Sequence, residues 1–419
     1  MRKKILFLAG MMACCSLAGA QEISKTWVAD KGNGTYQNPV LHADYSDPDV
    51  CAAGDDFYMT ASSFNCIPGI PILHSNDLVN WSLVNCALPI QEPEEFFDKA
   101  QHGKGVWAPA IRFHNGEFYI YWGDPDYGIY MIKAKDPKGR WSKPVLVKAG
   151  KGMIDPTPLW DEDGKVYLVH AYAGSRSGVN SIVVICELNA EGTEVISDPV
   201  MVFDGNDGKN HTVEGPKLYK RNGYYYIFAP AGGVATGWQL VLRSKNIYGP
   251  YESKIVMAQG KTNINGPHQG GWVDTNTGES WFIHFQDKGA YGRVIHLNPM
   301  TWVNDWPVIG VDKDKDGCGE PVTTYKKPNV GKTYLIATPP ESDEFNTRHL
   351  GLQWQWHANK KDTYGFTTDL GYIRLYAGSL SKKFVNFLEV PNLLMQKFPA
   401  EEFTATTKLT FTDKQDREQ

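Results

Sequence analysis

The chain has 419 residues, enough for one large domain and part of a second. Its formal net charge is −5 and it has no cluster of Lys and Arg. Nucleic-acid binding is therefore not expected, because phosphate contacts require such clusters. Forty-one glycines and 12% aromatic residues favour an all-β chain with many short strands and tight turns.

The N-terminus predicts export from the cytoplasm. Residues 1–20 combine a positive start at Arg2–Lys4, an apolar run at Ile5–Leu17 and a small-residue cleavage site at Ala18–Ala20. This order is typical of a signal peptide, and the apolar run is too short to span a membrane. We expect a secreted or periplasmic protein. Lipoprotein processing at Cys14 is the alternative, which the poor lipobox before that residue disfavours.

One sequence unit recurs five times along the chain, at intervals of roughly fifty residues. Each unit has an anchor residue, a short apolar step, a turn rich in Asp, Asn and Gly, and a β-rich segment. Asn-Gly and Asp-Gly between apolar runs are a strong hairpin signal. The five anchors are Asp47, Trp107, Asp155, Glu214 and His268.

This repeat predicts a five-bladed β-propeller over residues 35–330. A β-sandwich also has short strands at regular spacing, but it does not predict that one anchor position recurs in every unit. In a propeller, the innermost strand of each blade begins at the central channel. We therefore expect the five anchors to converge there, at equivalent positions of the five blades.

Three of the five anchors are carboxylates: Asp47, Asp155 and Glu214. An acid before a strand is often only a turn former, but three acids in different repeats favour a shared site. Cleavage of a glycosidic bond needs one carboxyl group that stays protonated, for the leaving oxygen, and one that stays ionised. A third carboxylate can raise the pKa of the acid by like-charge repulsion.

Taken together, these motifs resemble glycoside hydrolase family 43, whose members are five-bladed propellers that act on β-xylosides and α-L-arabinofuranosides. The resemblance covers about residues 36–330. It rests on the stretches NPVLHADYSDPDV, WAPAIRFHNGEFYIYW, MIDPTPLWDEDGKVYLVH, VEGPKLYKRNGYYYIF and GRVIHLNPMTW.

The resemblance implies a role for each carboxylate. Asp47 matches the general base of the family, Glu214 its general acid and Asp155 the residue that modulates the pKa of the acid. The family inverts the anomeric carbon, so Asp47 would activate water on one face of the sugar while Glu214 protonates the leaving oxygen on the other. Asp44 and Asp49 are rivals for the base. Asp47 is preferred because it matches the Asp-Pro motif of the family and, like Asp155, precedes a proline.

Four further residues are expected near the sugar. Arg293 matches a family position that hydrogen-bonds the sugar, and a surface salt bridge is its alternative. His268 matches a histidine that helps to hold a hydrated cation in several members, and a buried, hydrogen-bonded histidine is its alternative. No cofactor is expected to be required, but a structural calcium in the channel is compatible with this match. Trp107 either packs in the channel wall or stacks on a sugar, and Phe64 either lines the sugar site or is a core aromatic.

The chain departs from the family pattern in the first unit. Xylosidases of the family often have Glu-Trp-Phe before Pro-Gly, where this chain has Asn65-Cys66-Ile67. The missing Trp removes a stacking surface for the sugar, so xylose and arabinofuranose both stay open. Arg176 and Trp238 follow predicted blade strands and are further candidates for shaping the pocket.

The stretch Asp312–Gly317 resembles the start of an EF-hand calcium loop. Such a loop needs Glu at its twelfth position, where this chain has Thr323. We therefore expect a polar hairpin turn there.

After a linker at residues 326–329, period-two alternation predicts strands within residues 340–419, among them Leu352–Trp356 and Tyr372–Tyr376. In many relatives of the family, such a segment opens a β-sandwich of the concanavalin type. We expect a partial, truncated sandwich, because the segment is short for that domain and lacks a closing strand.

The sequence thus predicts a secreted, inverting glycoside hydrolase that removes xylosyl or arabinofuranosyl units from plant polysaccharides or oligosaccharides. The alternative is a non-catalytic carbohydrate-binding propeller, although a binder has no need for a carboxyl group with a raised pKa. A fructan-active propeller usually shows Asn-Asp-Pro-Asn-Gly in its first motif, where this chain has Ser46–Asp49. A carbohydrate is the expected partner, with no nucleic acid and no membrane span, and the oligomeric state stays open.

Overall fold

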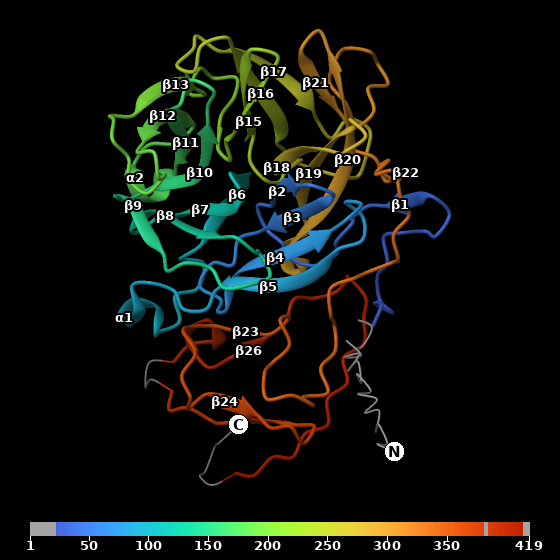
Figure 1. The fold of residues 1–419 in the computed structure, drawn as a ribbon. Coiled ribbons are helices and arrows are strands. Elements are labelled where there is room, and N and C mark those ends of the chain that lie inside the picture. The colour runs from blue at the N-terminus through green and yellow to red at the C-terminus, as the bar shows by residue number, and fades with distance from the viewer. Residues whose placement is uncertain (1–21, 381–383, 414–419) are drawn as a thin grey trace, which may run out of the picture.

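The computed structural model describes residues 22–380 and 384–413. The predicted signal peptide, residues 1–20, lies outside these ranges. Five antiparallel sheets of four strands each are arranged around a central axis (Figure 1). This arrangement confirms the predicted five-bladed β-propeller.

Each blade is built from four strands that follow one another in the chain. Blade 1 contains β2 (Asp49–Ala53), β3 (Asp56–Thr60), β4 (Gly69–Ser75) and β5 (Ser82–Leu88); blade 2 contains β6 (Trp107–His114), β7 (Glu117–Asp124), β8 (Gly128–Ala134) and β9 (Val145–Ala149); blade 3 contains β10 (Met153–Trp160), β11 (Val166–Tyr172), β12 (Ile182–Leu188) and β13 (Val200–Asp204); blade 4 contains β14 (Lys217–Arg221), β15 (Tyr224–Ala231), β16 (Trp238–Ser244) and β17 (Glu252–Met257); blade 5 contains β18 (His268–Asp274), β19 (Ser280–Asp287), β20 (Arg293–Val303) and β21 (Trp306–Ile309).

The backbone conformation of the Asn-Gly turns explains why hairpins within the blades could be predicted from the sequence. The turn between β6 and β7 has φ values of 48° at Asn115 and 78° at Gly116, and the turn between β14 and β15 has 51° at Asn222 and 75° at Gly223. Positive φ at both central residues defines the type I′ turn, which Asn-Gly favours and which matches the twist of a hairpin.

The propeller is closed by contacts outside its blades. The strand β1 (Thr35–Gln37) pairs with β22 (Thr324–Lys326), which follows blade 5. The side-chain amide of Asn38 donates hydrogen bonds to the carbonyl oxygens of Leu297 and Val322, at 2.8 and 2.7 Å. Each blade uses only consecutive strands, so no blade combines strands from the two ends of the propeller. The contacts of β1 and Asn38 therefore join these two ends.

A backbone kink marks the point where each innermost strand reaches the channel. The residues at the kink, all with positive φ, are Asp47 (55°), Ala108 (41°), Asp155 (57°), Gly215 (63°) and Gln269 (38°). In blades 2, 3 and 5 a shift of strand register accompanies the kink. Such bulges re-aim side chains, so that neighbouring residues can both face the channel.

The prediction of one equivalent position for all five anchors is wrong by one residue in three blades. Asp47 and Asp155 lie at the kink itself, whereas Trp107, Glu214 and His268 each precede it by one residue. In blade 4 the kink needs glycine, because a Cβ atom on Gly215 would lie 2.8 Å from the side chain of Gln269.

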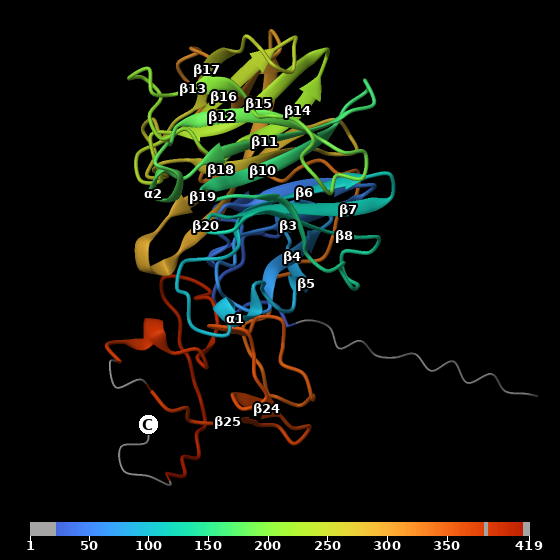
Figure 2. The same cartoon turned by 90° about the vertical axis from the view of Figure 1, so that its left-hand side faces the viewer.

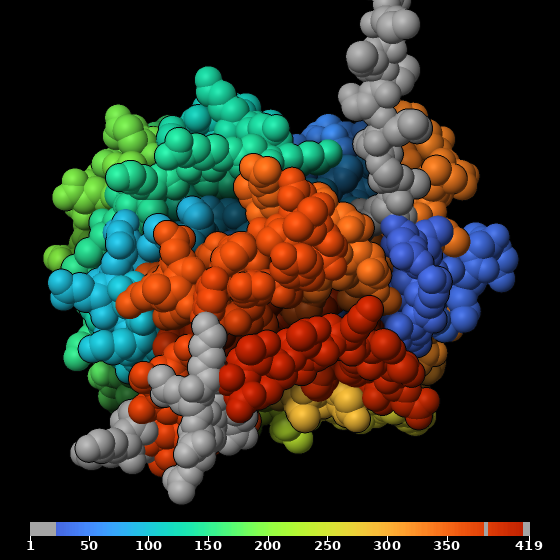
Figure 3. Space-filling view, turned by 90° about the horizontal axis from the view of Figure 1, so that it is seen from below, coloured from blue at the N-terminus to red at the C-terminus, as the bar shows by residue number. Residues whose placement is uncertain are grey.

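The segment that follows the propeller lies along one side of it, next to blade 1 (Figures 1 and 2), and covers much of the face shown in Figure 3. It contains two pairs of short strands: β23 (Gln355–Trp356) with β26 (Leu394–Met395), and β24 (Gly365–Thr367) with β25 (Ile373–Leu375). The strands predicted at Leu352–Trp356 and Tyr372–Tyr376 are thus present but shorter. Large apolar side chains such as Val385 and Leu409 are exposed there.

Helices are few and short in the described chain. They are α1 (Glu94–Phe97), α2 (Gly174–Ser177) and the 3-10 turns η1 (Gly289–Tyr291) and η2 (Phe387–Glu389). Among the described residues, no helix is long and apolar enough to cross a membrane.

The stretch that resembles an EF-hand, Asp312–Gly317, forms a loop closed by an antiparallel bridge between Val311 and Glu320. The backbone N–H of Gly317 donates a hydrogen bond to the Asp312 carboxylate at 2.9 Å. Neither side of the loop is helical in this described region, as expected for a polar turn.

Candidate active site

The Asp47 carboxylate is held by three hydrogen-bond donors at the mouth of the channel. Its Oδ2 accepts from the hydroxyl groups of Ser46 at 2.9 Å and Ser62 at 2.6 Å, and its Oδ1 accepts from the Arg293 guanidinium at 2.8 Å. The Ser62 hydroxyl in turn accepts from the backbone N–H of Ala108, at 2.8 Å. All three partners donate, so each oxygen of the Asp47 carboxylate accepts at least one hydrogen bond.

The second and third carboxylates, Asp155 and Glu214, lie close enough to interact electrostatically. Asp155 is buried, and its Oδ2 accepts a hydrogen bond of 2.7 Å from the backbone N–H of Gly215. Burial, followed by the charge of Glu214, raises the pKa of Asp155 to about 7. Glu214 is more accessible, with 28% of its side chain exposed, and its Oε1 lies 2.9 Å from His268 Nε2. The carboxylate with little access to solvent thus lies beside the carboxylate that can meet a substrate.

A buried layer of charges lies next to these residues in the channel. The Asp49 carboxylate pairs with Arg112 at 2.5 Å and accepts from the backbone N–H of Ile111 at 2.9 Å. Lys217 is fully buried, and its ammonium group interacts electrostatically with Asp49 and Asp155. The positive charge of Lys217 lowers the pKa of Asp155 and partly opposes the effect of its burial.

The structure separates Asp47 from its two rivals. Asp49 is buried in the ion pair with Arg112, and Asp44 accepts a hydrogen bond of 2.9 Å from the backbone N–H of Arg293. Asp47 shares the channel with Asp155, whose pKa its charge also raises.

Arg293 forms a salt bridge with Asp47. The alternative given for Arg293 was a salt bridge at the surface, whereas its partner here is a buried carboxylate. The Arg293 side chain as a whole is 29% exposed. The guanidinium carbon of Arg293 lies over the aromatic ring of Phe285, 4.7 Å from the ring centroid.

Trp107 and Phe64 belong to two stretches of chain that pair next to Ser62, a partner of Asp47. Phe64 lies two residues after Ser62, has a φ of 51°, and forms a β-bridge to Val106 with two backbone hydrogen bonds of 3.0 Å. Trp107 is half-buried, and its indole N–H donates to the carbonyl oxygen of Gly103 at 2.9 Å. Both side chains are partly accessible, so neither is a fully enclosed core aromatic.

Arg176 lies over the ring of Trp107, with its guanidinium carbon 5.7 Å from the ring centroid. It also pairs with Asp126 at 3.1 Å. Trp238 begins β16, and its ring meets the edge of His211 at 5.9 Å. Of the two pocket candidates, the structure places Arg176 against a residue of the channel mouth.

The described residues contain no group of three or more His, Cys, Asp or Glu that could hold a metal ion directly. His268 is buried, and its Nδ1 atom has no hydrogen-bond partner within the described chain. The Oε1 atom of Gln269, at the same kink, is likewise buried and unpaired there. These two atoms fit contact through water, so the channel calcium stays a prediction.

Several residues that shape the site were missed in the sequence. Lys217 belongs to a quoted motif and Ser62 lies outside all of them, and a serine in a loop and a lysine at a strand start carry no signal of their own. The two groups become significant only through their neighbours, Asp47 and Asp155.

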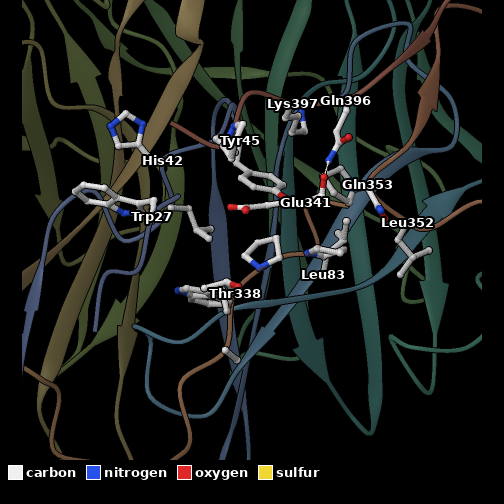
Figure 4. Close-up of a pocket in the computed structure, with 18 of the residues that line it drawn as sticks. Trp27, His42, Tyr45, Leu83, Thr338, Glu341, Leu352, Gln353, Gln396 and Lys397 are labelled. Atoms are coloured by element: carbon white, nitrogen blue, oxygen red, sulfur yellow. Dashed lines mark hydrogen bonds between the residues drawn. The ribbon is translucent and has the colours of Figure 1, made fainter. Parts of the chain in front are cut away.

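A separate cavity of about 60 Å³ lies between the N-terminal stretch, blade 1 and the C-terminal segment (Figure 4). Trp27, Tyr45, Glu341 and Lys397 are among the residues that line it. None of the three channel carboxylates does. The cavity is therefore a feature of the contact between propeller and C-terminal segment.

Two family models match the chain. The model described as "Glycosyl hydrolases family 43" matches residues 36–307. The model described as "Beta xylosidase C-terminal Concanavalin A-like domain" matches residues 342–419, in agreement with the expected sandwich of the concanavalin type.

Similar proteins include glycosidases with two different names. The chain is 41% identical to a putative beta-xylosidase of Xylanibacter ruminicola, over 92% of this chain and 70% of that protein. It is 31% identical to the non-reducing end alpha-L-arabinofuranosidase BoGH43B of Bacteroides ovatus, over 92% of this chain and 72% of that protein. The chain spans 65% of a beta-xylosidase of Formosa agariphila, at 36% identity.

Solved structures agree with the sequence matches. The structure named "Bacteroides ovatus Xyloglucan PUL GH43B" superposes with a TM-score of 0.74 at 27% identity, over 87% of this chain and 72% of that one. The GH43 protein BlXynB of Bacillus licheniformis superposes with a TM-score of 0.72 at 29% identity, with the same coverage. Because the family model alone spans more than half of the 419 residues, this chain belongs to glycosyl hydrolase family 43.

Proposed function

We propose that this family 43 glycosidase is an exported, inverting enzyme that removes xylosyl or arabinofuranosyl units from plant polysaccharides or oligosaccharides. The names of its relatives, which include beta-xylosidases and an alpha-L-arabinofuranosidase, support this class of substrate. The signal-like residues 1–20 support export.

The observation that carries the proposal is the difference between the surroundings of the carboxylates. The Asp47 carboxylate accepts hydrogen bonds from two hydroxyl groups and a guanidinium. Burial, followed by the charge of Glu214, raises the pKa of Asp155 to about 7. Two carboxylate environments that differ in this way suit a base and an acid within one site.

In the proposed mechanism, Asp47 accepts a proton from a water molecule that attacks the anomeric carbon. Glu214 donates a proton to the leaving oxygen in the same step, and the C–O bond to the leaving group breaks. Arg293 and the two serines keep Asp47 oriented. Asp155 keeps a proton available to the pair near neutral pH, and Lys217 limits that effect.

The choice between xylose and arabinofuranose depends on the first-blade loop. Cys66 stands where xylosidases of the family often have Trp, and it is partly buried. Because the Cys66 side chain is smaller than Trp, Phe64 and Trp107 are the aromatic residues of the two paired stretches of chain next to Ser62.

Hydrolysis of 4-nitrophenyl β-D-xylopyranoside and 4-nitrophenyl α-L-arabinofuranoside, assayed side by side, tests the proposed function. We expect release of 4-nitrophenol from at least one of them, and proton NMR of the first product should show the inverted anomer. A retained anomer would refute the inverting mechanism. Binding to xylan or arabinan without release from either glycoside or from their oligosaccharides would favour the carbohydrate-binding alternative.

The pH dependence of the reaction follows from the coupled pair. As the pH rises through about 7, the pKa reached by Asp155, the pair loses its proton and kcat/KM is expected to fall. In Asp155→Asn one charge of the pair is removed, so the alkaline limb of the profile should move to lower pH. The measurement is kcat/KM between pH 4 and pH 9 for both proteins, and an unchanged limb in the variant would contradict the coupling.

A further inference from the structure

Five residues of the C-terminal segment, Gln355–Asn359, are buried against loops that lead to the channel mouth. Trp356 and His357 are 2% and 3% exposed, and Ala358 and Asn359 are 0% and 4% exposed. These five residues therefore have almost no access to solvent.

The first loop that it contacts is residues 64–68, in blade 1. The backbones of Ile67 and Trp356 exchange two hydrogen bonds, at 2.9 and 2.6 Å. The side-chain amide of Gln355 donates to the carbonyl oxygen of Pro68 at 2.8 Å. This loop begins at Phe64 and thus directly follows the part of the chain that holds Asp47 through Ser62.

The second loop is residues 91–103, between blades 1 and 2. The side chain of Asn359 accepts from the backbone N–H of Gln91 at 2.9 Å and donates to its carbonyl oxygen at 3.0 Å. The backbone N–H of Asn359 donates to the carbonyl oxygen of Phe97 at 2.9 Å. This loop ends just before Trp107.

One side chain, Asn65, joins both loops to the segment. Its amide nitrogen donates to the carbonyl oxygen of His357 at 2.7 Å, and its amide oxygen accepts from the backbone N–H of Gly103 at 3.2 Å. The carbonyl oxygen of Gly103 accepts from the indole of Trp107 at 2.9 Å. Asn65 is 2% exposed, so it reaches solvent, and any substrate, hardly at all.

We propose that Asn65 is a positioning residue, which uses the C-terminal segment as a fixed support to set the position of Trp107 in the substrate pocket. The role needs a side chain that donates on one side and accepts on the other, as an amide does. The proposal rests on the proposed function for its effect on substrate, but the support itself exists whatever the substrate is.

Two substitutions separate the two sides of this connection. Asn65→Asp keeps an oxygen for Gly103 but loses the donor to His357 and places a carboxylate against that carbonyl oxygen. Asn65→Ala loses both contacts. Asn80→Ala is the matched control, because Asn80 is a buried amide in blade 1 that also accepts from the segment, at the backbone N–H of Ala337. Its other partners, Asp30 and Asp77, lie outside the site.

The experiment measures kcat and KM of the full chain on whichever 4-nitrophenyl glycoside the wild type hydrolyses. We expect Asn65→Asp and Asn65→Ala to raise KM by about tenfold, the effect of one buried hydrogen bond, with a smaller change in kcat. Asn80→Ala should lower the melting temperature and leave KM unchanged. In a double-mutant cycle with Trp107→Phe, which lacks the indole N–H, the effects of Asn65→Asp should not add.

Amide hydrogen exchange provides a readout that does not depend on activity. Exchange of residues 101–107 should become at least about tenfold faster in Asn65→Asp than in Asn80→Ala, at a temperature where both are folded. Faster exchange in a chain without glycosidase activity would support the positioning role and refute the proposed function. Additive effects with Trp107→Phe, or equal exchange in the two Asn variants, would overturn the positioning role. If Asn65→Asp does not fold, the same comparison is made with Asn65→Ala.

Discussion

Glu214→Gln is expected to lower kcat/KM on a natural oligosaccharide by about 10²–10⁴-fold, the range that a general acid contributes. Glutamine keeps the shape of the side chain and can still contact His268, which lies 2.9 Å from Glu214 in the wild type. It cannot donate a proton to a sugar leaving group, whose alkoxide is a strong base. The 4-nitrophenyl glycosides should lose less activity, because 4-nitrophenolate leaves without protonation.

The difference between the two kinds of substrate is therefore the informative result. Glu252→Gln is a suitable control, because Glu252 has 70% of its side chain exposed and pairs with Arg243 on blade 4. It should retain wild-type kinetics on both substrates. An equal loss by Glu214→Gln on both substrates would exclude Glu214 as the general acid, since the loss would then not depend on the leaving group.

Asp47→Asn is expected to lower kcat/KM by about 10²–10⁴-fold on every substrate. The attacking water needs a base in an inverting reaction whatever leaves from the other face of the sugar. The amide cannot accept that proton, and its nitrogen would face the donors of Ser46, Ser62 or Arg293. The loss should therefore be similar for 4-nitrophenyl glycosides and oligosaccharides, in contrast to Glu214→Gln.

The two rivals of Asp47 supply the controls for this prediction. Asp44→Asn should retain most activity, because Asp44 contacts only the backbone N–H of Arg293 among the hydrogen bonds of the described chain. Asp49→Asn should reduce stability by up to about 3–5 kcal/mol, because it leaves the half-buried Arg112 without its charged partner. Steady-state kinetics and thermal melting of the three variants distinguish these outcomes. Full activity in Asp47→Asn would require another base.

The resemblance in the sequence pointed to the carboxylates and to Arg293, but not to the contacts between them. Asp47 and Asp155 were recognisable because each precedes a proline in a repeated motif. The pairing of Asp47 with Arg293 could not be predicted in this way, since Arg293 lies 246 residues further along the chain. Asn65 and His357 are 292 residues apart, and neither residue alone suggests a contact.

The sequence by itself determined the number of blades, the order of their strands and the identity of the channel carboxylates. It could do so because every blade consists of consecutive hairpins, whose turns and strand periods are local properties of the chain. Contacts between distant parts of the chain could not be predicted, because they depend on closure of the propeller and on packing of the C-terminal segment. Only that closure brings Arg293 of blade 5 to Asp47 of blade 1, and only the packing of the C-terminal segment brings His357 to Asn65. The charge state and position of the site residues depend on such long-range contacts, because burial and neighbouring charges act through space and not along the chain.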